Sequence, residues 1–257
     1  MKAILTVLGS GTSMGVPTIG CDCPICRSSD PRDRRTRPSV LIEYGGRSVM
    51  IDTTPDFREQ AIRENIKSLD AVLYTHSHAD HILGIDDLRP LSFQHKPGRL
   101  PLYAHPEVVA FLRNMFRYIF DADYKFGGLP QVELKPLDGT LELFGAKFDP
   151  ITVIHGETEI YGFRFGSAAY LTDHSLVPEA SFAQLQDLDI LFLDALRHKP
   201  HPTHSTVENS LRIVERVKPR RAFFTHICHD LGHEATNAAL PEHVQLAYDG
   251  MKLEFEI

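Results

Sequence analysis

The feature that most constrains this chain is the stretch THSHADH at residues 75–81, which carries four metal-capable side chains. The four apolar residues directly before it predict a short buried strand, so the ligand-type residues fall where a strand ends and a helix begins. His76 and His78 are two apart in extended backbone and point the same way, whereas Asp80 and His81 lie past the turn and can face a second ion. Imidazole and carboxylate together suit zinc or manganese, so the stretch predicts one side of a two-ion site.

The chain length and charge narrow the class of protein. With 257 residues the chain can bury a substantial core, and we expect one domain over residues 1–257. Lys and Arg total 27 against 34 Asp and Glu, so no global basic field is available to hold a nucleic acid, although a local patch is not excluded. The apolar N-terminal stretch is short and interrupted by Thr6, which argues against a signal peptide or membrane span and predicts a cytoplasmic protein without a membrane partner.

Three of the four cysteines, Cys21, Cys23 and Cys26, lie within six residues, and the fourth is Cys228. In a reducing compartment this spacing indicates metal binding rather than disulfides. Three thiolates on one loop need a fourth ligand from elsewhere in the fold to complete tetrahedral structural zinc, and Cys228 is a candidate.

Apolar runs that end in polar residues recur along the chain. We expect strands at 4–8, 39–44, 47–52, 71–74, 100–104, 141–148, 151–154, 161–165, 168–172, 190–194 and 221–225, and helices at 56–67, 106–120 and 207–217. His155, Asp173 and His226 stand at or next to strand ends, so they can converge with the 75–81 stretch at one edge. Asp52 also ends a strand and can either orient a ligating histidine or cap the following turn. The pattern predicts two sheets packed face to face with helices outside.

Two segments each allow two interpretations. The small-residue loop Gly9–Gly15 is either a tight turn or a phosphate-binding loop, and the turn is favoured because no helix signature follows it. The predicted helix Pro106–Phe120 has more apolar surface than one core-facing stripe needs. A packed core helix is the favoured explanation, with a dimer surface or a lid as the alternatives, so a homodimer stays open.

The pattern HxHxDH at 76–81 resembles that of the metallo-β-lactamase superfamily, and the likeness extends over nearly the whole chain. The resemblance implies an α/β fold, a four-layer αββα sandwich, with a dinuclear site at one edge of the sheets. It implies that one ion is held by His76, His78 and His155 and the other by Asp80, His81 and His226, with Asp173 bridging the two.

The closer likeness is to the phosphoribosyl cyclic phosphodiesterase (PhnP-like) family. It is carried by the loop at 9–13, the cysteine cluster, the segment THICH at 225–229 and His204. This resemblance implies a structural zinc held by Cys21, Cys23, Cys26 and His229, in addition to two divalent ions, Mn or Zn, in the active site.

The resemblance implies hydrolysis of a small phosphodiester, which includes cyclic ribose phosphates. Two ions roughly 3.5–4 Å apart activate a water and stabilise both oxygens of an in-line displacement at phosphorus. Asp80 would offset the metal charge, and His204, not needed as a ligand, is free to protonate the leaving oxygen. Arg197, His198 and His201 are candidates for phosphate contact, although each is also an ordinary surface residue type.

Three other functions compete with this one. The tRNA 3′-processing ribonucleases resemble the chain in the same ligands, but they carry a long tRNA-gripping arm where seventeen residues separate His155 from Asp173 here. Glyoxalase-type thioester hydrolases add a C-terminal helical domain, whereas thirty-one residues follow His226. A non-enzymatic zinc-binding scaffold is disfavoured because all seven ligand positions are filled.

Overall fold

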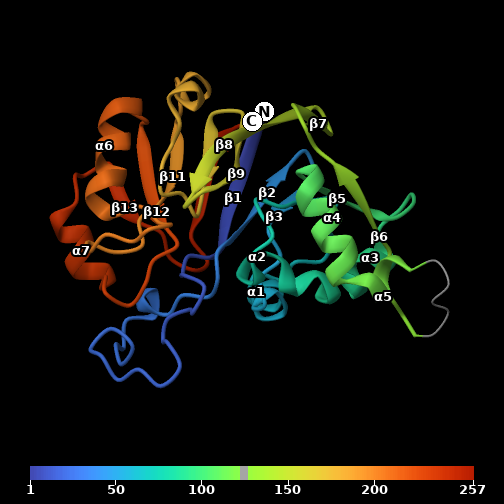
Figure 1. Cartoon of the computed structure of the whole chain (residues 1–257), viewed down its shortest axis with the longest axis horizontal. Helices are drawn as coiled ribbons and strands as arrows, with labels where there is room; N and C mark the ends of the chain where they lie inside the picture. Colours follow the sequence, from blue (N-terminus) through green and yellow to red (C-terminus); the bar gives the residue numbers. More distant parts are fainter. Residues whose placement is uncertain (122–126) are drawn as a thin grey trace.

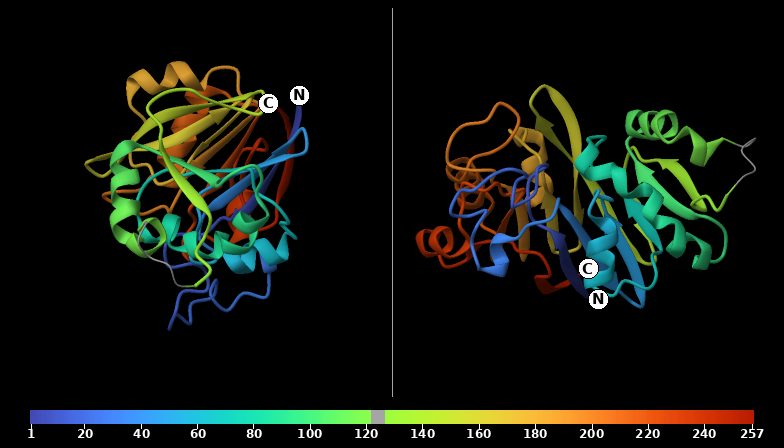
Figure 2. Two further views of the ribbon diagram at one scale, coloured as in Figure 1. Left: turned by 90° about the vertical axis from the view of Figure 1, so that its right-hand side faces the viewer. Right: turned by 90° about the horizontal axis from the view of Figure 1, so that it is seen from below.

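The computed structural model describes residues 1–121 and 127–257, which form two seven-stranded sheets packed face to face (Figures 1 and 2). The first sheet has the order β14 (Lys252–Glu256), β1 (Lys2–Gly9), β2 (Ser39–Tyr44), β3 (Arg47–Ile51), β4 (Ala71–Leu73), β5 (Leu100–Ala104), β6 (Val132–Pro136). The second has the order β13 (Val244–Leu246), β12 (Arg221–Thr225), β11 (Ile190–Asp194), β10 (Ala168–Leu171), β9 (Thr158–Phe165), β8 (Ala146–His155), β7 (Leu141–Leu143).

Helices lie on the outer face of each sheet. The first sheet carries α1 (Phe57–Arg63), α2 (Ala79–Ile82), α3 (Arg89–Gln94), α4 (Pro106–Met115) and α5 (Arg117–Phe120), and the second carries α6 (Val207–Val217) and α7 (His233–Ala239) (Figure 1). The expected αββα sandwich is therefore confirmed. Among the described residues, none of the helices has the length and apolar character needed to cross a membrane.

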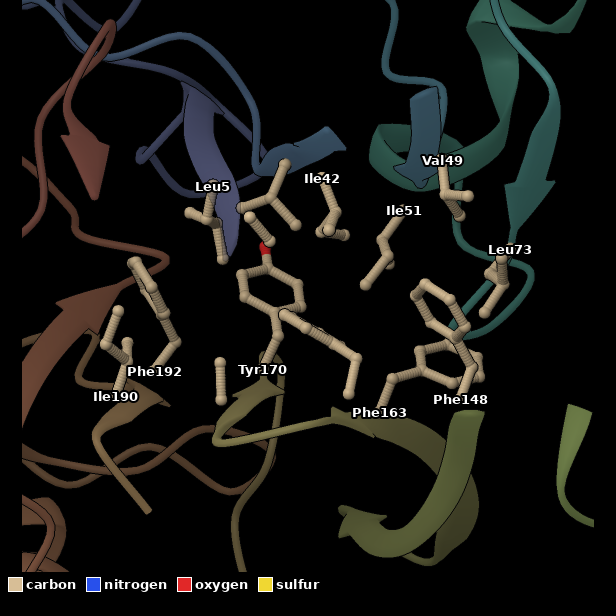
Figure 3. Packing of buried hydrophobic residues seen from close by; sticks show 14 of the residues in the cluster. Leu5, Ile42, Val49, Ile51, Leu73, Phe148, Phe163, Tyr170, Ile190 and Phe192 are labelled. Carbon is tan, nitrogen blue, oxygen red and sulfur yellow. The ribbon is translucent and has the colours of Figure 1, made fainter. Parts of the chain in front are cut away.

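The core between the sheets is built from the alternating inward residues of the strands. Figure 3 shows Leu5, Ile42 and Ile51 of the first sheet facing Phe163 and Phe192 of the second, and all five are fully buried. Separate apolar clusters lie between each sheet and its own helices. Because the central strands, such as β4, β10 and β11, are buried on both faces, their positions are fixed and they can hold side chains at the sheet edges with little freedom.

Strand direction explains why polar residues gather at one edge. Strands β3 to β6 are mutually parallel, and so are β10 to β13. The residues that follow β3, β4, β10 and β12 are Asp52, the 75–81 stretch, Asp173 and His226. Since ligands bind outside the carboxyl ends of parallel strands, this edge is where a site is expected.

Several boundaries differ from the sequence prediction. The predicted helix Pro106–Phe120 breaks at Phe116, whose φ of −102° and ψ of 41° are not helical, and gives α4 and α5. Leu112 and Phe116 are buried in the core, as a packed core helix requires, while Phe111, Met115 and Tyr118 are exposed. The strand predicted at 141–148 is divided by a turn into β7 and β8, whereas β6, β13, β14, α3 and α7 were not predicted.

The Gly9–Gly15 loop is a structural turn. The backbone N–H of Ser10 donates to Asp249 Oδ1 (2.9 Å), that of Gly11 to the Thr36 carbonyl (2.8 Å) and that of Thr12 to the Ile227 carbonyl (3.1 Å). These donors are already used, so the phosphate-binding interpretation fails for them. The loop instead anchors the chain next to His226.

The two chain ends lie side by side at the other end of the first sheet (Figure 1). Strands β1 and β14 pair in antiparallel register, with Lys2 opposite Glu256. The Met1 ammonium donates to the Ile257 carbonyl (2.9 Å), and the Ile257 N–H donates to the Met1 carbonyl (2.8 Å).

Candidate metal centre

The first group of candidate ligands consists of His76, His78 and His155. The loop after β4 carries the first two, and the third ends β8. The ring centroids of His76 and His78 lie 4.6 Å apart, and those of His78 and His155 lie 5.0 Å apart. One ring nitrogen from each lies within 4.8 Å of the other two. His78 is exposed and the other two are buried, so this group lies at the open side of the site.

The second group is buried and consists of Asp80, His81, Asp173 and His226. Asp173 Oδ2 lies 3.2 Å from His81 Nε2, and Asp173 Oδ1 lies 3.1 Å from His226 Nε2. Asp80 Oδ2 is 3.4 Å and 3.5 Å from the same two nitrogens. Asp173 also comes within 4.8 Å of a His155 nitrogen, so its carboxylate lies near both groups, where a bridging ligand would stand.

Asp52 hydrogen-bonds to His81 on the side of the ring that faces away from the other candidate ligands. Its Oδ2 accepts from His81 Nδ1 (2.7 Å) and from the Thr75 hydroxyl (2.9 Å), while Oδ1 accepts the Thr75 backbone N–H (2.9 Å). Of the two roles predicted for Asp52, the structure shows the orienting one. Because Nδ1 of His81 carries the proton in this contact, Nε2 is left as the lone-pair nitrogen facing the cluster.

Backbone strain coincides with the site. Asp52, Asp173 and His226 have φ values of 66°, 55° and 57°, in the left-handed region that residues other than glycine rarely adopt. Each follows directly, or after one residue, the end of a strand, so the sharp turn aims its side chain across the sheet edge. Such conformations cost on the order of 1 kcal/mol each and persist where the surroundings enforce them.

The chemistry of this donor set fits divalent metal ions. His76 Nε2 and His81 Nε2 are buried and form no hydrogen bond within the described residues, which is costly unless something else binds them. Burial lowers the pKa of His76 well below its usual value, which keeps the ring neutral as a ligand must be. Burial alone would raise the pKa of Asp173, but the attraction of His226 and His81 outweighs it and holds this carboxyl ionised.

His204 lies beside the second group, backed by an acid that sequence reasoning missed. Its ring stacks on that of His226, with centroids 4.5 Å apart, and Asp194 Oδ2 accepts from His204 Nδ1 (2.7 Å). Asp194 is fully buried at the end of β11. Burial and the nearby His226 lower the pKa of His204 to about 4. The position of Asp194 in the sequence could have indicated a role in the site, because it is the last residue of β11, and Asp52 and Asp173 come directly or two residues after a strand.

The three cysteines meet His229. Its Nδ1 lies 3.2, 3.6 and 3.4 Å from the sulfurs of Cys21, Cys23 and Cys26. Tetrahedral zinc with Zn–S of about 2.3 Å and Zn–N of about 2.0 Å separates such atoms by roughly 3.5 Å, so the four side chains fit it. Cys228 is buried elsewhere, where its sulfur accepts the Asp230 N–H, and it does not join this cluster.

Of the three residues predicted to contact phosphate, one lies beside His204 and two make other contacts. His201 lies with its ring centroid 5.0 Å from that of His204. Arg197 donates to the carbonyls of Lys199 and Pro200, and His198 pairs with Glu208 (2.6 Å). His201 is therefore the one of the three that the structure brings beside a residue of the candidate site.

The fold and this site define a class, and comparison with known proteins agrees. The model of the beta-lactamase superfamily domain matches residues 47–227, so the chain belongs to the metallo-β-lactamase superfamily. Within it the chain is PhnP-like. The crystal structure of a diphosphatase from the PhnP family is 63% identical, covers 99% of this chain and 98% of its own, and superposes with a TM-score of 0.94.

Two curated relatives are more distant. An octanoyltransferase of Porphyromonas gingivalis is 37% identical over 258 residues, which cover 98% of this chain and 51% of that protein. A ribonuclease Z of Bradyrhizobium diazoefficiens is 28% identical over 148 residues, which cover 55% of this chain and 48% of the relative. The chain thus spans about half the length of these curated relatives.

Proposed function

We propose that this chain, as one domain over residues 1–257, is a dinuclear metal-dependent phosphohydrolase acting on a small phosphodiester, such as a cyclic ribose phosphate, or on a small diphosphate. The observation that carries the proposal is the Asp173 carboxylate, which reaches two buried histidines and lies near the ligand atoms of the His76 group. The PhnP-family diphosphatase supports a phosphorus centre as the point of attack. Phosphodiesters and diphosphates share that centre and the same in-line displacement.

The proposed ligands are His76, His78 and His155 for one ion and Asp80, His81 and His226 for the other, with Asp173 shared. When bound, two divalent ions, zinc or manganese, supply a nucleophile from water near neutral pH and offset charge on phosphate oxygens. Asp52 fixes His81 in the tautomer that leaves Nε2 free, and the Asp173 carbonyl does the same for His155 by accepting from its Nδ1 (2.6 Å).

His204 is proposed as the group that serves the leaving oxygen. Asp194 holds the proton on its Nδ1, so Nε2 is the nitrogen that exchanges a proton with the substrate. The pKa of about 4 keeps His204 neutral without bound substrate, and a phosphate anion beside it would favour the protonated form. His204 can therefore stabilise developing charge as well as donate a proton.

Ribonuclease-like action on tRNA precursors is the second candidate because a ribonuclease Z is among the relatives. The interval between His155 and Asp173 is filled by β9 and β10, which belong to the second sheet, and the net charge is −7. Both observations favour a small substrate. Acyl transfer or thioester cleavage is a weaker candidate, which the name of the Porphyromonas relative makes worth including in a test.

The test is a substrate panel on metal-loaded wild type and Asp173→Ala. It contains 1,2-cyclic ribose phosphates, cyclic nucleotides, a dinucleoside diphosphate, bis-p-nitrophenyl phosphate, tRNA precursor and an octanoyl thioester. We expect turnover of the small phosphorus compounds by the wild type and a loss of at least about 100-fold in Asp173→Ala. Equal turnover by the two proteins would refute the bridging role, and a preference for tRNA precursor would establish the second candidate.

We also propose a structural zinc at Cys21, Cys23, Cys26 and His229. Its binding free energy would contribute to folding, because the unfolded chain holds no preformed site. Cys23→Ser should lower the melting temperature together with zinc content. An unchanged melting temperature with full zinc content in Cys23→Ser would exclude this site.

A further inference from the structure

One short segment serves both proposed metal sites. His226 belongs to the buried dinuclear group, and His229, three residues later, belongs to the cysteine group. We propose that the two sites are coupled, so that occupation of the cysteine site holds His226 in its ligating conformation, with buried Arg35 as the positioning residue. The inference rests on the proposed ligands and not on the proposed reaction.

The backbone between the two histidines is fixed at every residue. The Ile227 N–H donates to the Ser10 carbonyl (3.0 Å), and the Ile227 carbonyl accepts the Thr12 N–H (3.1 Å). The Cys228 N–H donates to the Leu196 carbonyl (3.1 Å). A displacement of His229 therefore cannot be absorbed by a loose linker and reaches His226 through packed, hydrogen-bonded backbone.

Arg35 joins this segment to the loop that carries the cysteines. Its side chain is completely buried, and its guanidinium donates to the carbonyls of Cys228 (3.1 Å) and Leu231 (2.8 Å) and to Asp33 Oδ1 (3.0 Å). The chain from β1 to β2, which holds the cysteines and Arg35, projects from the sandwich on the side of α7 (Figure 1). When no metal is bound, the hydrogen bonds of Arg35 are a main connection between the β1–β2 chain and the 226–229 segment.

His226 depends on such support because its backbone is strained, with φ at 57°. A residue other than glycine keeps that conformation only while its surroundings enforce it. Releasing His229 from the cysteines, or Arg35 from the Cys228 carbonyl, removes part of that enforcement. The ion that His226 would bind should then be held more weakly, while the His76, His78 and His155 group, on other strands, is unaffected.

The first test needs no substitution. Coupling between two sites is reciprocal, so Mn²⁺ in the dinuclear site must raise the affinity of the cysteine site by the same factor, typically about 5- to 150-fold. Cobalt(II) is titrated into metal-free wild type with and without saturating Mn²⁺, and binding at the cysteines is followed by the thiolate-to-cobalt charge-transfer absorption. We expect the cysteines to bind cobalt at least fivefold more tightly when Mn²⁺ is present. Identical curves would overturn the coupling.

The second test assigns the role of Arg35. Arg35→Lys keeps the charge but loses the forked contact to two carbonyls. Arg221→Lys is the matched control, since Arg221 starts β12, the strand that leads to His226, and pairs with Asp189 (2.8 Å) away from the segment. In folded Arg35→Lys we expect cobalt still to bind the cysteines, but one of the two Mn²⁺ affinities to fall at least fivefold by calorimetry.

The control should bind both Mn²⁺ ions as the wild type does. Wild-type Mn²⁺ affinities in Arg35→Lys would remove Arg35 from the proposal, and equal losses in both variants would show a general effect of stability rather than positioning. If Arg35→Lys does not fold, His229→Gln is the replacement, with loss of Mn²⁺ affinity expected and its retention refuting the coupling. All these measurements read metal binding, so inactivity toward phosphodiesters would leave them interpretable.

Discussion

Replacing Asp52 by asparagine removes a charge behind the site while keeping the shape of the side chain. Asp52 accepts three hydrogen bonds, from His81 Nδ1, the Thr75 hydroxyl and the Thr75 backbone N–H. Asparagine has one acceptor oxygen. If that oxygen keeps the backbone N–H of Thr75, the new NH₂ group faces the N–H of His81, and two donors oppose each other.

Two outcomes are open to the variant, and both weaken metal binding. Either the His81 contact is lost, leaving a buried donor unsatisfied at a cost of about 1–3 kcal/mol, or the proton of His81 moves to Nε2, the nitrogen that a metal needs. Losing a partner of this kind typically costs about 10- to 100-fold in metal affinity. We therefore expect Asp52→Asn to bind one of the two proposed active-site ions about 10- to 100-fold more weakly.

The assay is calorimetric titration of metal-free protein with Mn²⁺, accompanied by urea denaturation of the metal-free form. Asp70→Asn is the control, because Asp70 accepts the Ser48 N–H (2.8 Å) and an Arg47 N–H (2.9 Å) at the start of β4, remote from the ligands. It should lose some stability but no metal affinity. Unchanged affinity for both ions in folded Asp52→Asn would refute the orienting role of Asp52.

Three further outcomes are expected. Asp194→Asn should lower kcat by about 100-fold or more, with little change in KM, on whichever substrate of the panel the wild type hydrolyses, because Asp194 orients His204. The control is His198→Gln, which removes an exposed ion pair with Glu208 and should leave kcat unchanged. Burial, with Arg32 and Arg35, lowers the pKa of His233 from 6.5 to about 4, so the unfolded chain binds this proton first and stability falls as pH drops from about 6.5 to about 4. Between these two pH values, the unfolding free energy measured by urea denaturation should fall by up to about 3 kcal/mol less in His233→Gln than in the wild type. An equally steep fall in the two proteins would contradict this prediction. Phe192→Ala should cost about 3–5 kcal/mol by the same assay, since Phe192 is fully buried and stacks on Phe223 at 5.3 Å.

The sequence predicted what is local in the chain. The 75–81 stretch places its candidate ligands through residue spacing alone, and alternating apolar runs predicted most of the strands. Short edge strands such as β13 were missed because three residues carry too little periodicity. The break of the predicted 106–120 helix at Phe116 depends on packing against the first sheet, which propensity does not encode.

The strand ends indicated which distant residues gather at one edge, but most individual contacts between distant residues could not be predicted from the sequence. Residue spacing left Cys228 open as the partner of the three cysteines, and the family resemblance was needed to expect His229 there. The bond from Arg35 to Cys228, which spans 193 residues, was not expected. Asp194 was recognised as the end of a strand, but its bond to His204 requires the loop between them to fold back. Position at a strand end is thus a useful signal for such acids, although their partners emerge only from the fold.

The meeting of the chain ends has a consequence for engineering. β1 runs eight residues from Lys2 to Gly9, about 26 Å at about 3.3 Å per residue, and separates the ends from the Ser10 contact beside the site. A short linker from Ile257 to Met1 would close the backbone into a ring that could be reopened in an exposed loop. Circular permutants cut between β7 and β8, at the exposed Phe144, should keep the geometry of the candidate ligands. A protein fused at residue 1 or residue 257 would lie at the end of the first sheet remote from the candidate site.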